Sequence, residues 1–430
     1  MGSLLAPACV VAILAATACA SPDEPVPSTG GPSGDPSAIS RSILRVGDVL
    51  VVVDPDVGSV SVLNPVTLEP IGRIDVGAEP RQLLDLGGGR LAVALHGGDE
   101  VVTVDVSTLS VVERQTVCLG PFGMTRRPSG TLVVACEFDG RVVELDSGAV
   151  RTLGAVPRVR TVALLGDDVV AASFVGTEAR LWRLGLGGAV AVDPSLNGEA
   201  DGRPSLATFS PTQLSALLPT PDGGLWLAMQ LVDNGPGAGE PRSYGAVADG
   251  EPRVTPVVVR LGPDLMPTGP ATYAVFDRGD RAFNAPSGLA FTRDGSLAVV
   301  HRSSGDLGVL EPEATAPATR VLASHRAGKG PGGVTIDPVT GHAFVDNAFD
   351  GSVTRIDLEG GDPPLTRLRS LPKRFSAAAL AGRRTFHDAR NVHLTPLAVV
   401  ACSTCHPEGA DDGLVWSLHA GAVTPRARRS

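Results

Sequence analysis

Short apolar runs alternate with turns along most of this chain and recur with a period of about 40 residues. Each unit holds an apolar strand, a turn rich in Gly or Asp, and a strand in which apolar and polar residues alternate, which is the pattern of paired β-strands. Turns such as Asp139-Gly140 and Asp350-Gly351 supply residues that tolerate positive φ. The second and third strands of the units are the clearest, and we predict them at 49–53 and 60–63, 91–95 and 101–105, 132–135 and 142–146, 169–172 and 180–184, 225–228 and 257–261, 297–300 and 307–310, and 342–345 and 353–357.

Seven such units predict an all-β fold, a seven-bladed β-propeller over residues 42–371. A unit of this size cannot bury both faces by itself, so neighbouring units stack around a central channel. Insertions near 193–211 and 233–254 lengthen two units. The second insertion, within 231–256, reads as a surface excursion, with a ligand-binding border as the alternative. No strand is visibly exchanged between the two ends, so the sequence does not predict how the ring closes.

Two segments, Gly333–Pro338 (GVTIDP) and Gly351–Asp357 (GSVTRID), resemble the YVTN-type (lactonase-like) propeller family, and the resemblance covers about 42–371. It implies an architecture and no particular chemistry, because that family includes both enzymes and binding scaffolds. A lactonase-like hydrolase would need acidic and His side chains around the channel, and the blades show no catalytic constellation. We interpret the scattered imidazoles as strand-end or loop residues: His96, His301, His325 and His342.

The composition agrees with many short strands joined by tight turns, since Gly (52) and Pro (36) are frequent and aromatic residues make up only 4%. The formal net charge is −10, and no basic stripe accompanies it. Nucleic acid is therefore excluded as an expected partner.

The N-terminus reads as an export signal at 1–20, with an apolar run over Leu4–Ala18 that is short for a bilayer span. Ala16-Thr17-Ala18-Cys19 resembles a lipoprotein cleavage box, which implies acylation of Cys19, membrane attachment through that lipid, and a periplasmic or cell-envelope location. Plain secretion and an uncleaved anchor are the alternatives. Residues 21–41, rich in Pro, Ser and Gly, are expected to form a disordered tether.

Residues 402–406 carry the sequence Cys-Ser-Thr-Cys-His, the attachment signature of a c-type haem. Cys402 and Cys405 would bind one haem c covalently, and His406 would be the proximal ligand of its iron. The other interpretations are a chance match, a redox Cys-x-x-Cys, or half of a zinc site, although no second ligand pair follows. Of the remaining cysteines, Cys118 and Cys136 form either a disulfide in an oxidising compartment or two buried thiols.

The propeller is followed by a segment at 372–430 that predicts two helices, at 376–385 and at 394–401, the second with Thr395 as N-cap and Pro396 in its first turn. Gly382–Arg390, Ala401–Gly409 and Asp412–Trp416 resemble the start of the cytochrome c domain of di-haem cytochrome c peroxidases and MauG-like proteins. That resemblance assigns Cys402, Cys405 and His406 the roles given above.

Only 24 residues follow His406, too few to wrap a haem or to supply a second attachment motif. We therefore expect an incomplete, truncated or decaying cytochrome c segment, and assign no peroxidase activity, since that chemistry needs two haems. Candidate sixth ligands are His387, His393 and His419. The sequence predicts an exported haem-binding propeller protein in electron transfer, with an unidentified redox partner. The alternative is a non-enzymatic binding or scaffold lipoprotein with a vestigial cytochrome segment.

Overall fold

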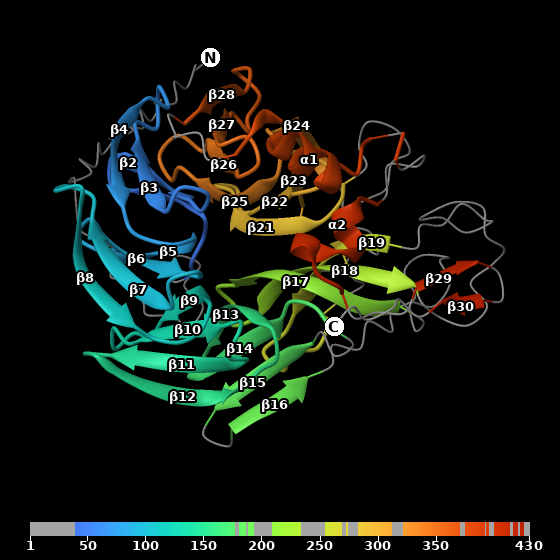
Figure 1. Cartoon of the computed structure of the whole chain (residues 1–430), viewed down its shortest axis with the longest axis horizontal. Helices are drawn as coiled ribbons and strands as arrows, with labels where there is room; N and C mark the ends of the chain where they lie inside the picture. Colours follow the sequence, from blue (N-terminus) through green and yellow to red (C-terminus); the bar gives the residue numbers. More distant parts are fainter. Residues whose placement is uncertain are drawn as a thin grey trace, which may run out of the picture. The chain divides into compact units, whose positions relative to one another are not determined.

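The computed structural model contains seven four-stranded antiparallel sheets arranged as the blades of a propeller (Figure 1). It describes residues 39–430 except 177–179, 186–187, 193–208, 234–253, 269–271, 274–282, 312–320, 370–374, 392, 395–399, 413–415, 420–421 and 425–430. The predicted all-β, seven-bladed fold is confirmed, and each predicted second and third strand lies in a blade. The export signal, Cys19 and the helix predicted at 394–401 lie wholly or mostly outside the described residues.

Each blade is formed by four strands that follow one another in the chain. The first three blades contain β1 (Ile43–Val46), β2 (Val49–Asp54), β3 (Ser59–Leu63) and β4 (Pro70–Asp75); β5 (Pro80–Gly87), β6 (Arg90–Leu95), β7 (Glu100–Asp105) and β8 (Ser110–Thr116); and β9 (Pro121–Arg126), β10 (Leu132–Cys136), β11 (Arg141–Asp146) and β12 (Ala149–Ala155).

The other four blades have the same order of strands. They contain β13 (Val159–Leu165), β14 (Asp168–Ser173), β15 (Leu181–Gly185) and β16 (Gly188–Val192); β17 (Phe209–Pro219), β18 (Leu225–Asp233), β19 (Val254–Leu261) and β20 (Thr272–Tyr273); β21 (Pro286–Phe291), β22 (Leu297–His301), β23 (Asp306–Leu310) and β24 (Val321–Arg326); and β25 (Pro331–Ile336), β26 (Ala343–Asn347), β27 (Ser352–Ile356) and β28 (Leu365–Leu368).

Burial along the strands explains the sequence pattern. The second strand of a blade, such as β6 or β22, is buried on both faces because it packs between the sheets of two neighbouring blades. The outermost strand, such as β8, is largely exposed and carries charged residues that discourage pairing with other chains. The predicted apolar second strands thus form the contacts between blades.

The ring closes by side-chain packing between the last and the first blade. The inner strand β25 lies next to β1, as β21 lies next to β25. Phe344 and Val353 of the seventh blade form one apolar cluster with Ile43, Leu50 and Val52 of the first. No strand is exchanged among the described residues of the two blades, which answers the question that the sequence left open.

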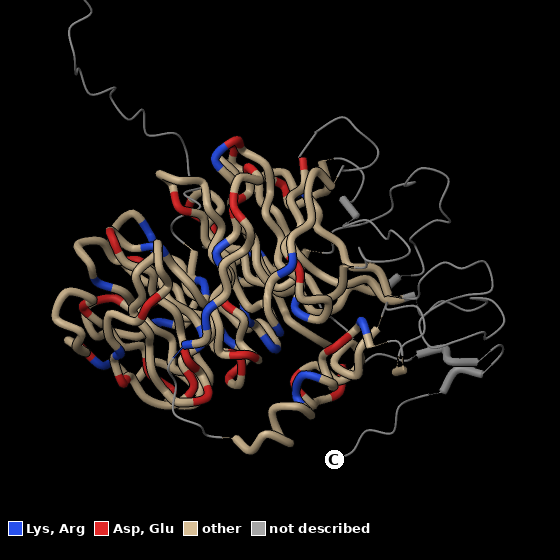
Figure 2. Tube along the Cα trace, turned by 90° about the horizontal axis from the view of Figure 1, so that it is seen from above, with Lys and Arg blue, Asp and Glu red and all other residues tan. Residues whose placement is uncertain are grey.

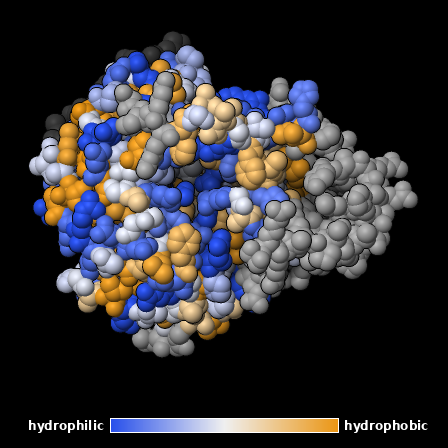
Figure 3. Space-filling model, in the orientation of Figure 1, coloured by the Kyte–Doolittle hydropathy of each residue, from blue (hydrophilic) through white to orange (hydrophobic). Residues whose placement is uncertain are grey.

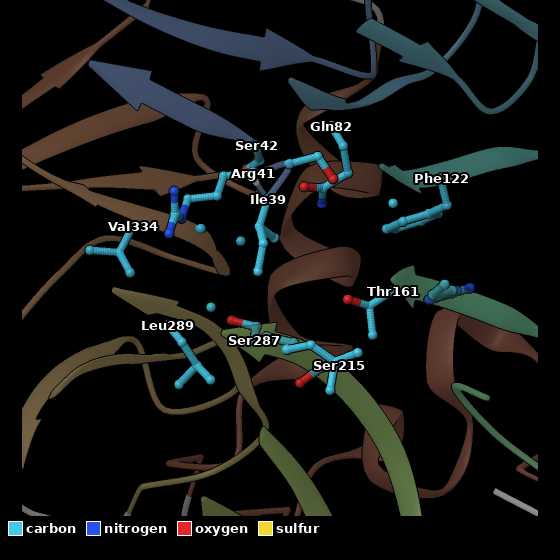
Figure 4. A pocket seen from close by; sticks show the side chains of 18 residues that line it. Ile39, Arg41, Ser42, Gln82, Phe122, Thr161, Ser215, Ser287, Leu289 and Val334 are labelled. Atoms are coloured by element: carbon cyan, nitrogen blue, oxygen red, sulfur yellow. The ribbon is translucent and has the colours of Figure 1, made fainter. Parts of the chain in front are cut away.

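A short N-terminal segment, residues 39–42, lies inside the central channel (Figure 4). The backbone N–H of Ser40 donates to Met124 of β9 (3.0 Å), and Arg41 exchanges hydrogen bonds with Leu83 of β5 (2.8 and 2.7 Å). The disordered tether predicted for residues 21–41 is therefore too long at its C-terminal end, since residues 39–41 make these contacts. Unpaired inner-strand N–H and C=O groups facing the channel give the segment its partners.

After the last blade come α1 (Ala377–His387), the one-turn helix α2 (Cys402–Cys405) and the 3-10 turn η3 (Pro407–Gly409). A separate hairpin is formed by β29 (Trp416–His419) and β30 (Ala422–Thr424). The helix predicted at 376–385 is confirmed, with the Ser376 hydroxyl accepting from the N–H of Ala379 as its N-cap (3.1 Å). Within the described residues, none of the helices is both long and apolar enough to span a bilayer.

Candidate functional site

The attachment motif forms a single helical turn on one face of the ring, labelled α2 in Figure 1, and Figure 2 shows Lys, Arg, Asp and Glu distributed over the described trace. The N–H of His406 donates to the carbonyl of Cys402 (2.9 Å), and the Thr404 hydroxyl accepts from the N–H of Ala401 (2.9 Å). Cys402 is exposed and Cys405 is buried, and both are thiols rather than disulfide partners. The turn therefore holds the two thiols on a compact backbone, with Cys402 open to solvent.

The propeller supports this turn directly. The buried amide of Gln213, on inner strand β17, donates to the carbonyl of Thr404 (2.9 Å). The last carbonyls of a helix lack partners within the helix, so a side-chain donor at this position stabilises its end. Gln213 has a positive φ of 49°, at an irregular register of β17 with β18. The bend in β17 thus provides the group that holds the motif.

His406 lies just after the turn with an exposed imidazole. Its Nδ1 atom is 3.3 Å from the carbonyl oxygen of Ala410. A carbonyl can only accept, so this contact places a proton on Nδ1 and leaves Nε2 as the ring nitrogen that could bind a metal. Metal-binding histidines commonly have their second ring nitrogen fixed in this way. The contact therefore orients the imidazole for ligation through Nε2.

A charged network joins the turn after the motif to the propeller. The guanidinium group of Arg160, on β13, donates to both carboxylate oxygens of Glu408 (3.0 and 2.7 Å) and of Glu137 (2.8 and 2.9 Å). His96 Nε2 lies 3.1 Å from Glu137, and the Phe174 ring packs against Arg160 at 3.8 Å. Bidentate pairs of this kind fix orientation as well as charge.

The same network shifts the protonation of its carboxyl groups. Burial alone would raise the pKa of Glu408, but Arg160, Arg81 and Arg302 outweigh it and lower that pKa to about 2. Burial would also raise the pKa of Glu137, but hydrogen bonds from His96 and Arg160 outweigh burial and lower that pKa. Both carboxylates are ionised at neutral pH, which balances the buried Arg160 charge.

Helix α1 is fastened to the same face by further ion pairs. Arg383 donates to both oxygens of Asp56 (3.0 and 2.8 Å), and Arg384 pairs with Asp350 (2.8 Å). Lys329 reaches Asp388, directly after the helix (3.1 Å). Asp56 and Asp350 lie in the turns that follow blade strands β2 and β26. In the view of Figure 3, hydrophilic residues are prominent near the middle of this face.

A large cavity lies between this face and the C-terminal segment, with an empty volume of about 2000 Å³ that includes space open to solvent. Its walls combine aromatic and cationic groups. Phe138 and Phe349 come from blade turns and Phe375 and Phe386 from the C-terminal segment, and the charged residues include Arg81, Arg302, Arg383 and Glu408. Such a cavity suits a large flat ligand that carries negative groups at its edge.

The candidate residues predicted from the sequence lie in different surroundings in the structure. Cys118, just after β8, and Cys136, at the end of β10, are joined by a disulfide. His387 lines the cavity, whereas His393 is exposed. His419 ends β29, and its side chain lies outside the described part of the chain. Most of the insertion at 231–256 is likewise outside it.

His96, Glu137 and Arg160 were missed as members of the site. His96, Glu137 and Arg302 each directly follow the second strand of a blade, namely β6, β10 and β22. Equivalent positions in a propeller repeat lie on the same face of the ring. Aligning the seven units and reading the residue after each second strand would therefore have brought these charged residues together. Arg160, inside β13, has no such signal.

The central channel offers no comparable chemistry. Its cavity has an empty volume of about 480 Å³ and is lined by inner-strand residues together with Ile39–Ser42 (Figure 4). Among the described residues that line it, none is His, Asp or Glu. The acidic and imidazole groups required for a lactonase-like hydrolase are therefore missing from this lining.

No protein-family model and no curated protein matches the chain. Among solved structures, the chain is similar to the hydrazine synthase of Kuenenia stuttgartiensis, with 18% identity and a TM-score of 0.58 over 78% of this chain and 99% of that one. Virginiamycin B lyase from Staphylococcus aureus matches with 12% identity and a TM-score of 0.45, over 74% of this chain and 92% of that one. At these identities the likeness shows the propeller fold alone.

Proposed function

We propose that this chain is an exported protein that carries one haem c, attached to Cys402 and Cys405 with His406 as an iron ligand, and that it serves in electron transfer. The carrying observation is the folded Cys402–His406 turn, in which an imidazole oriented through Nδ1 stands beside two thiols. The turn continues into Glu408 and Gly409, which line the cavity described above. The residues that directly follow the motif thus form part of the cavity wall.

The residues present fit the chemistry of a haem. Each thiol S–H would add across one vinyl C=C of the porphyrin, forming a C–S bond and passing its hydrogen to the other vinyl carbon, so that no oxidant would be consumed. The four phenylalanines of the cavity suit the apolar ring, and Arg81 and Arg302 suit its two propionates. When bound, the iron would supply one-electron chemistry between its ferrous and ferric states.

The ion pairs favour an integral segment over a vestigial one. Arg160 has 6% of its side-chain surface exposed, and Glu408 covers it from the C-terminal side. Removing the segment would take from this guanidinium group one of its two carboxylate partners, and from Asp56 its bidentate pair with Arg383. Losing one partner of a buried pair is costly. A decaying segment would not be expected to keep such contacts.

Export is supported by two kinds of cysteine chemistry. The Cys118–Cys136 disulfide is the form expected in an oxidising compartment. Covalent haem attachment would take place in the same compartment. We propose a periplasmic or cell-envelope location, with membrane attachment through a lipid on Cys19. Labelling with a radioactive fatty acid in the native host should mark the wild-type protein and leave Cys19→Ala unlabelled.

The test of haem attachment is a pyridine haemochrome spectrum and a haem-stained denaturing gel, on protein made together with a cytochrome c maturation system. Wild type should stain and give one haem per chain. The double variant C402S/C405S should be colourless, and Cys402→Ser should give a haemochrome band displaced toward that of a haem with one free vinyl group. The matched control C118S/C136S removes two cysteines elsewhere, which form a disulfide, and should keep haem in the folded fraction. A wild-type protein that matures without colour contradicts the proposal.

A further inference from the structure

His387 is the last residue of α1 and lines the cavity to which Glu408 and Gly409, just after the attachment turn, also contribute. Its ring packs against Phe349 of the seventh blade (4.3 Å between centroids) and against Phe386 (5.1 Å, nearly perpendicular). Helices α1 and α2 are neighbours, so His387 and the Cys402–His406 turn belong to one compact unit. The aromatic contacts on two sides restrict the imidazole to a defined orientation.

One ring nitrogen of His387 lacks a hydrogen-bond partner in the described part of the protein. Its Nδ1 atom is buried and has no hydrogen-bond partner within the described residues. Buried polar atoms without partners are rare and call for an explanation such as a bound group. Burial, and then the charge of Arg302, lower the pKa of His387 to about 3, so the imidazole is neutral and keeps a lone pair at neutral pH. A neutral imidazole is the form that binds iron.

The other imidazoles of this region do not meet these conditions. His96 also lines the cavity, but its two ring nitrogens lie 3.4 Å from Glu79 and 3.1 Å from Glu137. His393 is exposed and points to no cavity that we describe. Of the two described histidines that line the cavity, His387 is therefore the one with a ring nitrogen that has no hydrogen-bond partner in the described part of the protein.

We propose that His387 is the second axial ligand of the haem iron, so that a haem held by Cys402 and Cys405 would be six-coordinate with two imidazoles. This inference rests on the proposed haem attachment. Two strong-field nitrogen ligands would make the iron low-spin and would leave no open position for peroxide. A chain with one haem would then suit outer-sphere electron transfer rather than peroxidase chemistry.

The experiment compares matured wild type, His387→Ala and His393→Ala by two measurements. The pyridine haemochrome replaces the axial ligands, so it reports covalent attachment regardless of His387. The electron paramagnetic resonance and visible spectra of the folded ferric protein report the axial ligands. We expect one haem per chain in all three, low-spin iron in wild type and His393→Ala, and high-spin iron in His387→Ala that returns to low spin on adding imidazole.

The outcomes separate the two claims. Suppose that all three proteins carry haem. Low-spin iron in His387→Ala, or high-spin iron in wild type, would then overturn the axial-ligand inference without affecting haem attachment. No haem in wild type overturns both. If His387→Ala does not fold, His387→Met provides a second route, because a thioether ligand raises the reduction potential of a c-type haem. An unchanged potential in haem-loaded His387→Met would contradict the inference.

Discussion

Arg160 of the propeller and Glu408 of the C-terminal segment form a bidentate ion pair, with nitrogen–oxygen distances of 3.0 and 2.7 Å across 248 residues of sequence. The pair links the attachment turn to inner strand β13. Because Arg160 is also held by Glu137, the segment docks onto a guanidinium group that is already oriented.

Replacing Glu408 by Gln should loosen the attachment turn. The variant removes the charge opposite a nearly buried Arg160 while keeping the size of the side chain, and we expect a loss of about 1–2 kcal/mol in unfolding free energy. Amide hydrogen exchange over 400–410 should become faster than in wild type. Glu359→Gln, whose partner Arg293 is 3.9 Å away at the surface, is the control and should change neither measurement. Equal exchange in both variants would show that the pair does not hold the segment.

Loss of the disulfide should weaken the third blade. The bond between Cys118 and Cys136 closes a loop with a sequence separation of 18, and removing a cross-link of this size costs about 2–4 kcal/mol through the entropy of the unfolded chain. Urea unfolding of C118A/C136A should therefore have a lower midpoint than that of wild type. Comparing both proteins in a C402S/C405S background keeps the other thiols out of the result. An unchanged midpoint after full oxidation of the reference would contradict the expectation.

The stability of the protein should fall in acid partly through His301. This residue is buried against Phe283, opposite Asp306 in the register of β22 with β23, and burial lowers the pKa of His301 from 6.5 to about 3. Between these pH values the unfolded chain binds a proton at His301 that the folded chain does not bind. The contribution of neutral His301 to the unfolding free energy is therefore present above pH 6.5 and is lost as the pH falls toward 3.

Urea unfolding between these two pH values should show a shallower decline in stability for His301→Leu than for wild type. Phe283→Leu is the control, because it removes the aromatic neighbour without removing a titratable group. It should lower stability at every pH and keep the wild-type slope. The expectation fails if both variants show the same slope.

Two glycines should respond oppositely to alanine. A Cβ on Gly123 of β9 would lie 2.4 Å from the backbone oxygen of Arg160 and 3.0 Å from the Cα of Thr161, so the inner strands of two blades would have to separate. We expect Gly123→Ala to lower the unfolding free energy by about 1–3 kcal/mol. Gly382, within α1, has open space around its Cβ position, and Gly382→Ala should stabilise the helix by about 0.5–1 kcal/mol. Thermal unfolding of the two variants tests this interpretation. Midpoints that move in the same direction would refute it.

The repeated strands could be predicted because their signal is local. Runs such as 91–95, followed by a turn and 101–105, show both the length and the alternation of paired strands, and β6 and β7 lie there. The closure of the ring could not be predicted, since it depends on packing between Phe344 and residues such as Ile43 that are about 300 positions apart. The channel segment 39–42 was missed because its few residues follow a polar, Pro-rich stretch.

The chemistry of the site divides in the same way. Cys402, Cys405 and His406 are adjacent in sequence, so their motif identifies them. Their surroundings come from residues far apart in the sequence, and neither the Arg160–Glu408 pair nor the aromatic contacts of His387 can be recognised in the local pattern. The repeat itself carries part of this information, as the shared position of His96, Glu137 and Arg302 shows.

The segment at 39–42 also determines how the propeller bears mechanical load. A pull arriving from the N-terminal side would first strain the hydrogen bonds of Ser40 and Arg41 to β9 and β5, two blades that do not contain the first strand. The force would thus be spread over the hub of the ring before it reached β1. If force were applied to the N-terminal end through a lipid anchor, it would act on the inner strands around the channel before it acted on the outer strands.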